Sequence, residues 1–312
     1  MYLFSNVLGV FVFDNEFNVV DEILFGSLED YWNKGNFVKK IQNKHKGIKE
    51  PGQEELKKIL LHFKNSRFFN DFRSKNLELT KYGVKNFVKE DVLLIQAINS
   101  IDEIDRVVNS LAKRLREWYE LYNPEFSKAV DSHEKFVEGI LEKEKDELLK
   151  ELKINSGDSI GADLKQEDLE PIRSFTHQIY DLCQLRKAQM DYVSALMDRI
   201  CPNTKAVCDV LTGARLIERA GSLKRLSEMP ASTIQILGAE KALFRHMKTG
   251  SRPPRHGVII HHPLIAKAPE EMHGRIARAL ADKISIASKI DYFQGKFIGD
   301  RLRKELEEKF AK

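Results

Sequence analysis

Cysteine is scarce in this chain of 312 residues, and long apolar runs are missing from it. Cys183, Cys201 and Cys208 form no C-x-x-C pair and lie among apolar neighbours, so we expect reduced packing residues rather than disulfides or a zinc site. No run of about 18 apolar residues occurs, which argues against a membrane span. The first residues also lack the basic segment and the cleavage site of a signal peptide. These absences predict a soluble, intracellular protein without a membrane partner.

The glycine-rich loops that bind nucleotide phosphates are also missing. Neither G-x-x-x-x-G-K-[ST] nor G-x-G-x-x-G follows an expected strand, which argues against a nucleotide-dependent enzyme. Lys248-Thr249-Gly250 matches one β-lactamase element, but the partner elements S-x-x-K and S-D-N are not found together with it, so we interpret the match as chance. We therefore predict no catalytic site, no metal and no cofactor in this chain.

Acidic residues are absent from one stretch of the chain. Between Glu240 and Glu270, 29 consecutive residues contain no Asp or Glu, whereas 47 acids are spread over the 312 residues of the chain. The stretch carries six cations, namely Lys241, Arg245, Lys248, Arg252, Arg255 and Lys267. A solvated basic face is the ordinary interpretation of such a run, but ordinary surfaces mix both signs. Arg and Lys on a Gly/Pro-containing loop can follow phosphates, so we predict contact with nucleic acid.

The distribution of charge supports this prediction. The net charge is +4, but residues 205–312 carry 21 Lys and Arg against 12 Asp and Glu. That gives the rear of the chain a charge of +9 and leaves −5 for the front. A chain divided in this way is expected to bind a polyanion through its C-terminal part and another partner through its N-terminal part. Only Phe244 is available for stacking in the acid-free stretch, which favours folded RNA over single strands there.

Three histidines, His256, His261 and His262, leave an enzymatic alternative open. They could serve an RNA-modifying or RNA-cleaving enzyme as a general base or as metal ligands. Zinc sites usually add a Cys or a carboxylate at fixed spacing, and the region contains neither. A junction or packing role is the interpretation that we favour.

The order of patterns predicts three parts and an α+β fold that is mostly α. Residues 1–118 open with VLGVFVF and NVVDEILF around a polar turn, which is typical of a hairpin of two half-buried strands. Helices beginning at Pro51 and covering roughly residues 91–112 complete a small α/β domain. Residues 119–204 are predicted to form a long antiparallel coiled-coil hairpin. Residues 205–312 are predicted to form a compact α-helical domain, in which a helix opening at Pro269 has the apolar stripe Ile276, Leu280, Ile284 and Ala287.

A heptad pattern after Pro171 predicts the second helix of that hairpin. Spacings of 3 and 4 join Ile172, Phe175, Ile179, Leu182, Arg186, Gln189, Val193, Leu196 and Ile200. The helix would span roughly 43 Å. We expect its partner to be an earlier helix with Val130, Val137, Ile140, Leu141, Leu148 and Leu152, joined to it through the turn NSGDSIGAD. The rod is either a spacer or a dimerisation element, and Arg186 and Gln189 either set its register or leave an exposed gap.

Several motifs then resemble one known family. GAEK (residues 238–241), ALFR (242–245), TGSRPPRHG (249–257) and KISIASKIDYF (283–293) follow one another, and REWYELYNPEF (116–126) precedes them. In this combination and order they resemble the Nop domain and the entry to the family's coiled-coil region. The resemblance is dense over about residues 116–310 and looser over the first 110. The short length without a long Lys-rich tail is similar to the archaeal form.

The resemblance implies a scaffold of the box C/D small ribonucleoprotein, which directs 2′-O-methylation of RNA. The N-terminal domain would hold fibrillarin, the methyltransferase that uses S-adenosylmethionine, and the chain itself would contribute positioning rather than chemistry. The coiled coil would pair two copies, for which we name Ile179, Leu182, Val193 and Leu196. The Nop domain would bind a box C/D guide RNA together with a ribosomal-type kink-turn-binding protein. An archaeal member would be cytoplasmic.

The motifs also assign residues to the RNA. GAEK and ALFR would place Gly238, Ala239, Glu240, Ala242, Leu243 and Phe244 near the duplex of guide and substrate RNA. The resemblance adds His261 and Lys289 to Lys241, Arg245, Lys248, Arg252 and Arg255 as RNA-binding residues. A splicing-type relative that binds a small nuclear RNA instead of a methylation guide remains a third alternative.

Overall fold

The structure is a computed structural model that describes residues 1–45, 47–64 and 66–310. The chain divides into two compact units, Met1–Lys89 and Glu90–Lys312. Among the described residues, no helix is both long enough and apolar enough to cross a membrane.

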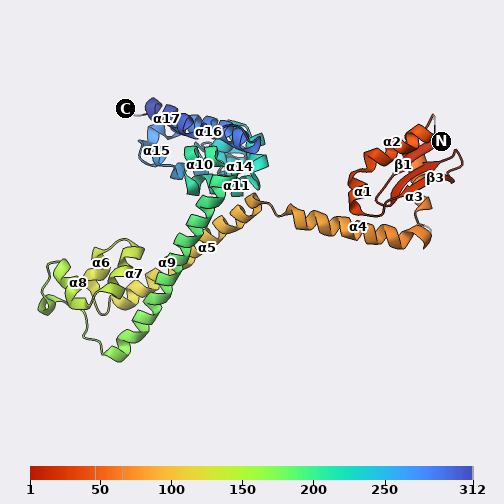
Figure 1. The fold of residues 1–312 in the computed structure, drawn as a ribbon. Coiled ribbons are helices and arrows are strands. Elements are labelled where there is room, and N and C mark those ends of the chain that lie inside the picture. Colours follow the sequence, from red (N-terminus) through yellow and green to blue (C-terminus); the bar gives the residue numbers. More distant parts are fainter. Residues whose placement is uncertain (46, 65, 311–312) are drawn as a thin grey trace. The chain divides into compact units, whose positions relative to one another are not determined.

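An antiparallel sheet of order β1-β2-β3 lies in the first unit (Figure 1). Its elements are β1 (Tyr2–Ser5), β2 (Gly9–Phe13), β3 (Val19–Leu24), α1 (Leu28–Trp32), α2 (Lys34–Lys44), α3 (Gln53–His62) and α4 (Ser66–Phe87). The predicted hairpin is confirmed, because β2 pairs with β3 and Val10 lies opposite Ile23. Strand β1 and helix α4 were not predicted from the sequence.

The central strand β2 is buried on both faces, whereas half-buried strands were predicted. Phe11 packs on one face against Phe63, with ring centroids 4.9 Å apart. Val10 packs on the other face in a cluster with Ile41 of α2. Because alternate side chains of a strand point to opposite faces, helices on both sides bury every side chain of β2. The predicted α/β character of this domain is confirmed.

The second unit is helical throughout its described elements. These are α5 (Glu90–Tyr119), α6 (Pro124–Ala129), α7 (His133–Glu142), α8 (Lys145–Glu151), η1 (Ser156–Asp158), α9 (Gln166–Ile200), α10 (Pro202–Cys208), α11 (Val210–Ala220), α12 (Leu223–Glu228), α13 (Ala231–Ile236), α14 (Glu240–Thr249), η2 (Val258–His261), α15 (Pro263–Ala266), α16 (Glu270–Tyr292) and α17 (Gly299–Phe310). In Figure 1, α6–α8 lie at one end of the α5–α9 pair and α10–α17 at the other. The fold class, mostly α with a small sheet, is as predicted.

A long antiparallel hairpin is present, and its two helices are α5 and α9. Glu90 at the start of α5 pairs with Arg199 at the end of α9 at 3.2 Å. Midway along both helices, Asp105 forms an ion pair with Arg186, so this arginine contacts the helix opposite, and its role in setting the register stays a prediction. The predicted domain boundary at residue 118 would separate α5 from the helix on which it packs.

The expected partner segment, residues 130–152, does not form one long helix. Val130 and Lys143 adopt extended backbone conformations and end α6 and α7. The segment therefore folds into short helices, which pack around Phe136 near the end of α5. The 30-residue helix α5 instead supplies an uninterrupted buried stripe along α9. The heptad pattern predicted α9 correctly, but it could not identify the helix that packs against it.

The residues named for dimerisation are used inside one chain. Ile179 is fully buried, and Leu182 is half-buried against the same cluster. Val193 and Leu196 are fully buried in the core of the C-terminal helical domain. Their burial leaves no apolar seam at these positions for a second copy. Self-association of the hairpin stays a prediction, and it would have to use other side chains.

The motif REWYELYNPEF closes the far end of this hairpin. Arg116 donates hydrogen bonds to the carbonyl oxygens of Ser127 at 2.7 Å and Val130 at 2.6 Å, and its guanidinium lies over the Phe136 ring at 4.2 Å. Asn123 caps α6 by accepting a hydrogen bond from the Phe126 N–H. The motif is thus a structural corner within this chain.

The C-terminal helical domain is organised around α16. Its predicted apolar stripe is confirmed, since Ile276, Leu280, Ile284 and Ala287 are buried. All three cysteines are free and buried, and burial raises the pKa of the Cys201 and Cys208 thiols. The interpretation of the cysteines as packing residues is confirmed.

Candidate nucleic-acid interface

A glycine turn sets the direction of α14, the helix that carries the first predicted cations. Gly238 has a φ of +88°, and a Cβ atom there would lie 2.5 Å from Val258 Cγ2. Its N–H donates to Glu240 Oε1 at 2.7 Å, so the exposed Glu240 holds the turn. A left-handed backbone at a close approach favours glycine. The turn therefore gives Gly238 and Glu240 of the GAEK motif a local structural role.

Helix α14 buries none of its residues. Lys241, Arg245 and Lys248 are exposed, while Ala242, Leu243 and the preceding Ala239 are half-buried. Phe244 is 60% exposed and therefore is not the core residue that it could have been. Large apolar side chains on an unburied basic helix are suited to a partner that offers both apolar surface and negative charge.

The loop after α14 is anchored at both ends. Gly250, with a φ of +68°, ends the helix in the left-handed conformation. At the other end, Gln235 Nε2 donates to the Arg255 carbonyl at 2.7 Å, and the Gly257 N–H donates to the Gln235 carbonyl at 2.8 Å. Arg252 lies exposed between these anchors. The loop therefore holds its two arginines on a defined backbone path.

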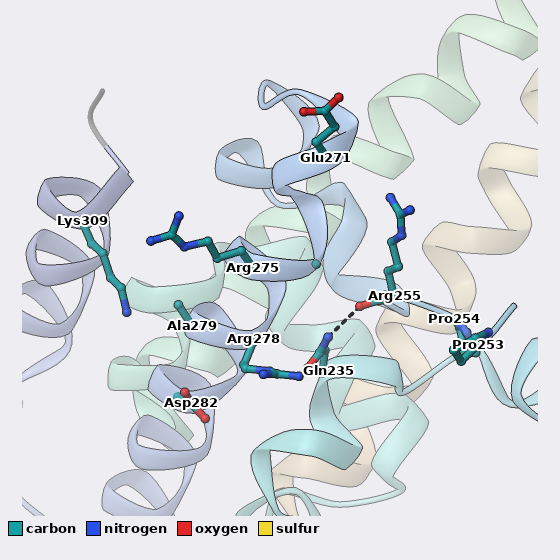
Figure 2. Close-up of a pocket in the computed structure, with 11 residues that line it drawn as sticks. Gln235, Pro253, Pro254, Arg255, Glu271, Arg275, Arg278, Ala279, Asp282 and Lys309 are labelled. Carbon is teal, nitrogen blue, oxygen red and sulfur yellow. Dashed lines mark hydrogen bonds between the residues drawn. The ribbon is translucent and has the colours of Figure 1, made fainter.

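A groove of about 610 Å³ connects this loop with α16 and α17. Its cationic side chains are Arg255, Arg275, Arg278 and Lys309, and its acids are Glu271 and Asp282. Figure 2 shows Arg278 extending toward Gln235 and Arg275 extending toward α17, where Lys309 lies. These two α16 arginines were not among the residues predicted to bind RNA. Their position outside the apolar stripe was the signal that could have identified them.

The cations of this surface lack acidic partners. Among the described parts of the chain, Lys241, Arg245, Lys248, Arg252, Arg275, Arg278 and Lys289 form no ion pair, and Arg255 pairs only with Glu270 at 3.6 Å. Helix α17 of the same domain shows the ordinary pattern, in which cations pair four residues along the helix, as in Arg303 with Glu307 at 2.9 Å. An excess of unpaired positive charge is suited to a polyanion.

The three histidines have different surroundings. His262 is buried, and its Nε2 lies 3.1 Å from the Val207 carbonyl while its Nδ1 accepts from the Leu264 N–H at 3.2 Å. Burial lowers the pKa of His262, so a neutral ring caps α15. His256 packs edge-on against His273 at 5.8 Å, and burial lowers its pKa as well. Only His261 is exposed. This arrangement does not form a shared catalytic centre.

The structure brings one loop cation to the α16 arginines and leaves the other predicted cations apart from them. Arg255 lines the groove together with Arg275 and Arg278, whereas Lys241, Arg245 and Lys248 lie exposed on α14. Lys289 is exposed on the same face of α16 as Arg278, about 16 Å further along the helix axis. The surface is therefore extended rather than a single pocket, as expected for a backbone-tracking nucleic-acid interface.

Relatives of this chain occur among known proteins. The sequence profile of the Nop family, described as "snoRNA binding domain, fibrillarin", matches residues 100–312. The chain belongs to the Nop family. The match covers the helical domain with the basic surface. It also covers the α5–α9 hairpin except for the first residues of α5.

Individual relatives extend the likeness toward the N-terminus. A NOP5 family protein of Methanocaldococcus jannaschii is 40% identical over 274 residues, covering 82% of this chain and 64% of the relative. Nucleolar protein 56 of Schizosaccharomyces pombe is 40% identical over 246 residues, covering 72% of this chain and 50% of the relative. The Nop-family chain described here therefore spans about half to two thirds of the length of these curated relatives. A crystal structure of a fibrillarin/Nop5p complex is similar with a TM-score of 0.46 and 23% identity, covering 99% of this chain and 98% of the solved one.

Proposed function

We propose that this Nop-family chain is an RNA-binding scaffold of a box C/D small ribonucleoprotein. Its helical C-terminal domain binds guide RNA together with a kink-turn-binding protein, and its N-terminal unit holds the methyltransferase fibrillarin. S-adenosylmethionine belongs to that partner, and the chain positions RNA and enzyme for site-directed 2′-O-methylation without performing chemistry.

One observation carries this proposal: among the described residues, the exposed cations of α14, the following loop and α16 lack acidic partners, apart from Arg255, which pairs with Glu270. A basic surface built for a protein partner would be expected to mix signs and to bury apolar area at its centre. Here the cations spread along two helices and an anchored loop, which is suited to a phosphate backbone. His261 and the half-buried Ala242 and Leu243 would then lie at the edge of that RNA.

The deciding experiment measures capture of a preassembled kink-turn RNA and its binding protein. The variant replaces Lys241, Arg245, Arg252 and Arg255 with Ala. The matched control replaces Arg106, Arg114, Lys224 and Lys304, four exposed cations that pair with acids on their own helices. Contacts with about six phosphates give a slope of log K against log salt of about −4 to −5. We expect the first variant to lose binding and to flatten this slope, and normal assembly of that variant would refute the proposal.

The protein partners are tested by copurification. The full chain is mixed with fibrillarin, a kink-turn-binding protein, guide RNA and substrate RNA, and each component is omitted in turn. Retention of fibrillarin supports the methylation scaffold and disfavours the splicing-type alternative.

The proposal also includes a pair of copies joined through the hairpin and a cytoplasmic location in an archaeal cell. Light scattering of the full chain measures whether the pair forms.

A further inference from the structure

The end of α16 presents aromatic side chains that the acid-free stretch lacks. The chain turns back after Tyr292, where Gln294 adopts a φ of +55° and the Gly295 N–H donates to the Ile290 carbonyl at 2.8 Å. This turn leaves Phe293 76% exposed, edge-on to Tyr292 with ring centroids 5.1 Å apart. Phe297, four residues on, is 53% exposed. We refer to Tyr292, Phe293 and Phe297 as the aromatic ledge.

A groove of about 470 Å³ adjoins the ledge, and Tyr292 and Phe297 line it. This volume is within the range of small-ligand sites. The segment that carries Phe297 is held in place, because the Ile298 N–H donates to Asn203 Oδ1 at 2.6 Å. The ring of Phe297 also lies close to the backbone of Gly299, where a Cβ atom would be 3.1 Å from Phe297 Cε2. The ledge is thus preorganised by the fold rather than formed by loose side chains.

We propose that the aromatic ledge stacks the bases of a single-stranded RNA segment whose phosphates contact Lys289 and Lys296. The inference rests on the proposed function and extends its surface beyond Lys289 to side chains that the proposed function does not use. Exposed aromatic rings interleaved with cations are the usual platform for single-stranded nucleic acid. Both lysines are exposed, and neither forms an ion pair within residues 1–45, 47–64 and 66–310.

The two acids that line the groove are already engaged, which favours RNA over a basic or neutral peptide. Glu90, on the groove wall, pairs with Arg199 at 3.2 Å. Asp291 is buried and accepts four hydrogen bonds from Asn203 and Thr204. The unpaired charge at the ledge is therefore positive. Because Asn203 is also buried, with its amide bonded to Asp291 and to the Ile298 N–H, few polar groups remain to read base edges, so binding should tolerate different sequences.

The ledge continues the surface already described. Exposed residues recur on one face of α16 at Arg275, Arg278, Asp282, Ile286, Lys289 and Phe293, with spacings of 3 or 4 that keep them in line. This stripe is about 27 Å long. It begins in the basic groove and ends at the ledge. A strand leaving a folded RNA at the groove would reach the aromatic rings along it.

Binding of a short fluorescein-labelled oligouridylate to the full chain tests the ledge. We expect Phe293→Ala to weaken binding on the order of tenfold, the effect of losing one stacked base. Phe293→Leu should weaken it similarly, because Leu retains apolar area but has no aromatic face. Tyr192→Ala, which removes an exposed aromatic from α9, should leave affinity unchanged. A Phe293→Leu variant that binds the oligouridylate with the affinity of the unchanged chain would overturn base stacking.

Cross-linking locates the contact independently of affinity. An oligonucleotide containing 4-thiouridine is irradiated with the full chain, which is then digested with trypsin. The expected adducts lie in the peptides IDYFQGK (residues 290–296) and FIGDR (297–301). Adducts confined to other peptides would refute the ledge. Capture of the folded kink-turn complex is measured in parallel, so that loss of the ledge alone leaves the proposed function standing, whereas failure of that capture counts against the proposed function.

Discussion

Asp291, near the end of α16, accepts two hydrogen bonds from Asn203 at the start of α10, from the backbone N–H at 3.0 Å and from Nδ2 at 2.8 Å. Its other oxygen accepts two more from Thr204 at 2.7 Å. A carboxylate from a distant helix therefore caps α10, whose own N-cap residue is Cys201. This link joins the end of the hairpin to the helix that lines the basic groove.

Removal of this cap should destabilise the helical domain. We expect Asp291→Ala to lower the free energy of unfolding by about 3 kcal/mol, because it leaves buried donors of Asn203 and Thr204 unsatisfied. Asp282→Ala, an exposed acid on the same helix, is the control and should change it by less than about 0.5 kcal/mol. Urea unfolding measures both. Equal effects of the two variants would show that the cap is dispensable.

Because the heptad residues are buried within one chain, we expect their substitution to lower stability rather than to change the oligomeric state. Ile179→Ala should lower the free energy of unfolding by about 3 kcal/mol through a cavity between α9 and its neighbours. Leu185→Ala, on an exposed face of the same helix, should have little effect. A variant that stays fully stable but changes from dimer to monomer by light scattering would place Ile179 in a contact between copies after all.

Substitution of two glycines near α14 distinguishes the cost of a steric conflict from the cost of backbone strain. Gly238 and Gly250 both have positive φ, but only Gly238 faces a close neighbour, since nothing lies within 4 Å of a Cβ placed at Gly250. Gly250→Ala should cost about 1 kcal/mol of unfolding free energy, and Gly238→Ala clearly more. Thermal unfolding of the two variants provides the comparison. Identical losses would mean that Val258 moves aside freely.

The buried histidines predict lower stability in acid. Burial lowers the pKa of His262 and His256 from the ordinary 6.5, so below that pH the unfolded chain binds more protons than the folded one. Stability is therefore fully present above about pH 6.5 and is lost as the pH falls toward the folded pKa values. His262→Gln should flatten the dependence of Tm on pH, and His261→Gln, at an exposed position, should not. An unchanged slope in His262→Gln would contradict the assignment.

The α16 arginines should contribute to RNA binding as charges. Arg275→Gln and Arg278→Gln are each expected to reduce the salt slope of RNA binding by about 1, the loss of one phosphate contact. Arg301→Gln removes the same charge from α17, where Arg301 pairs with Glu305 at 3.8 Å, and should leave the slope unchanged. Binding isotherms over a range of salt concentrations measure this. Equal slopes for all three variants would exclude the groove from the interface.

Much of the candidate surface was accessible from the sequence because charge and local periodicity are local properties. The absence of acids around Lys241 and Arg252 marked the basic helix and loop, and the stripe through Ile276 and Leu280 marked the buried face of α16. The exposure of Arg275 and Arg278 can be deduced from the sequence, because both lie outside this stripe. Their approach to Lys309 cannot be deduced in this way, because it depends on how α16 and α17 pack.

By itself, the sequence determined the fold class, the helical character of α9 and α16, the strand hairpin and the basic rear of the chain. Each of these depends on neighbours within about one or two turns. Only the tertiary structure decided that α5 pairs with α9, that Ile179 and Leu196 are buried inside one chain, and that Asp291 caps α10. A heptad pattern specifies an apolar stripe but not the stripe that covers it, because any helix of matching length and apolarity can compete for that position.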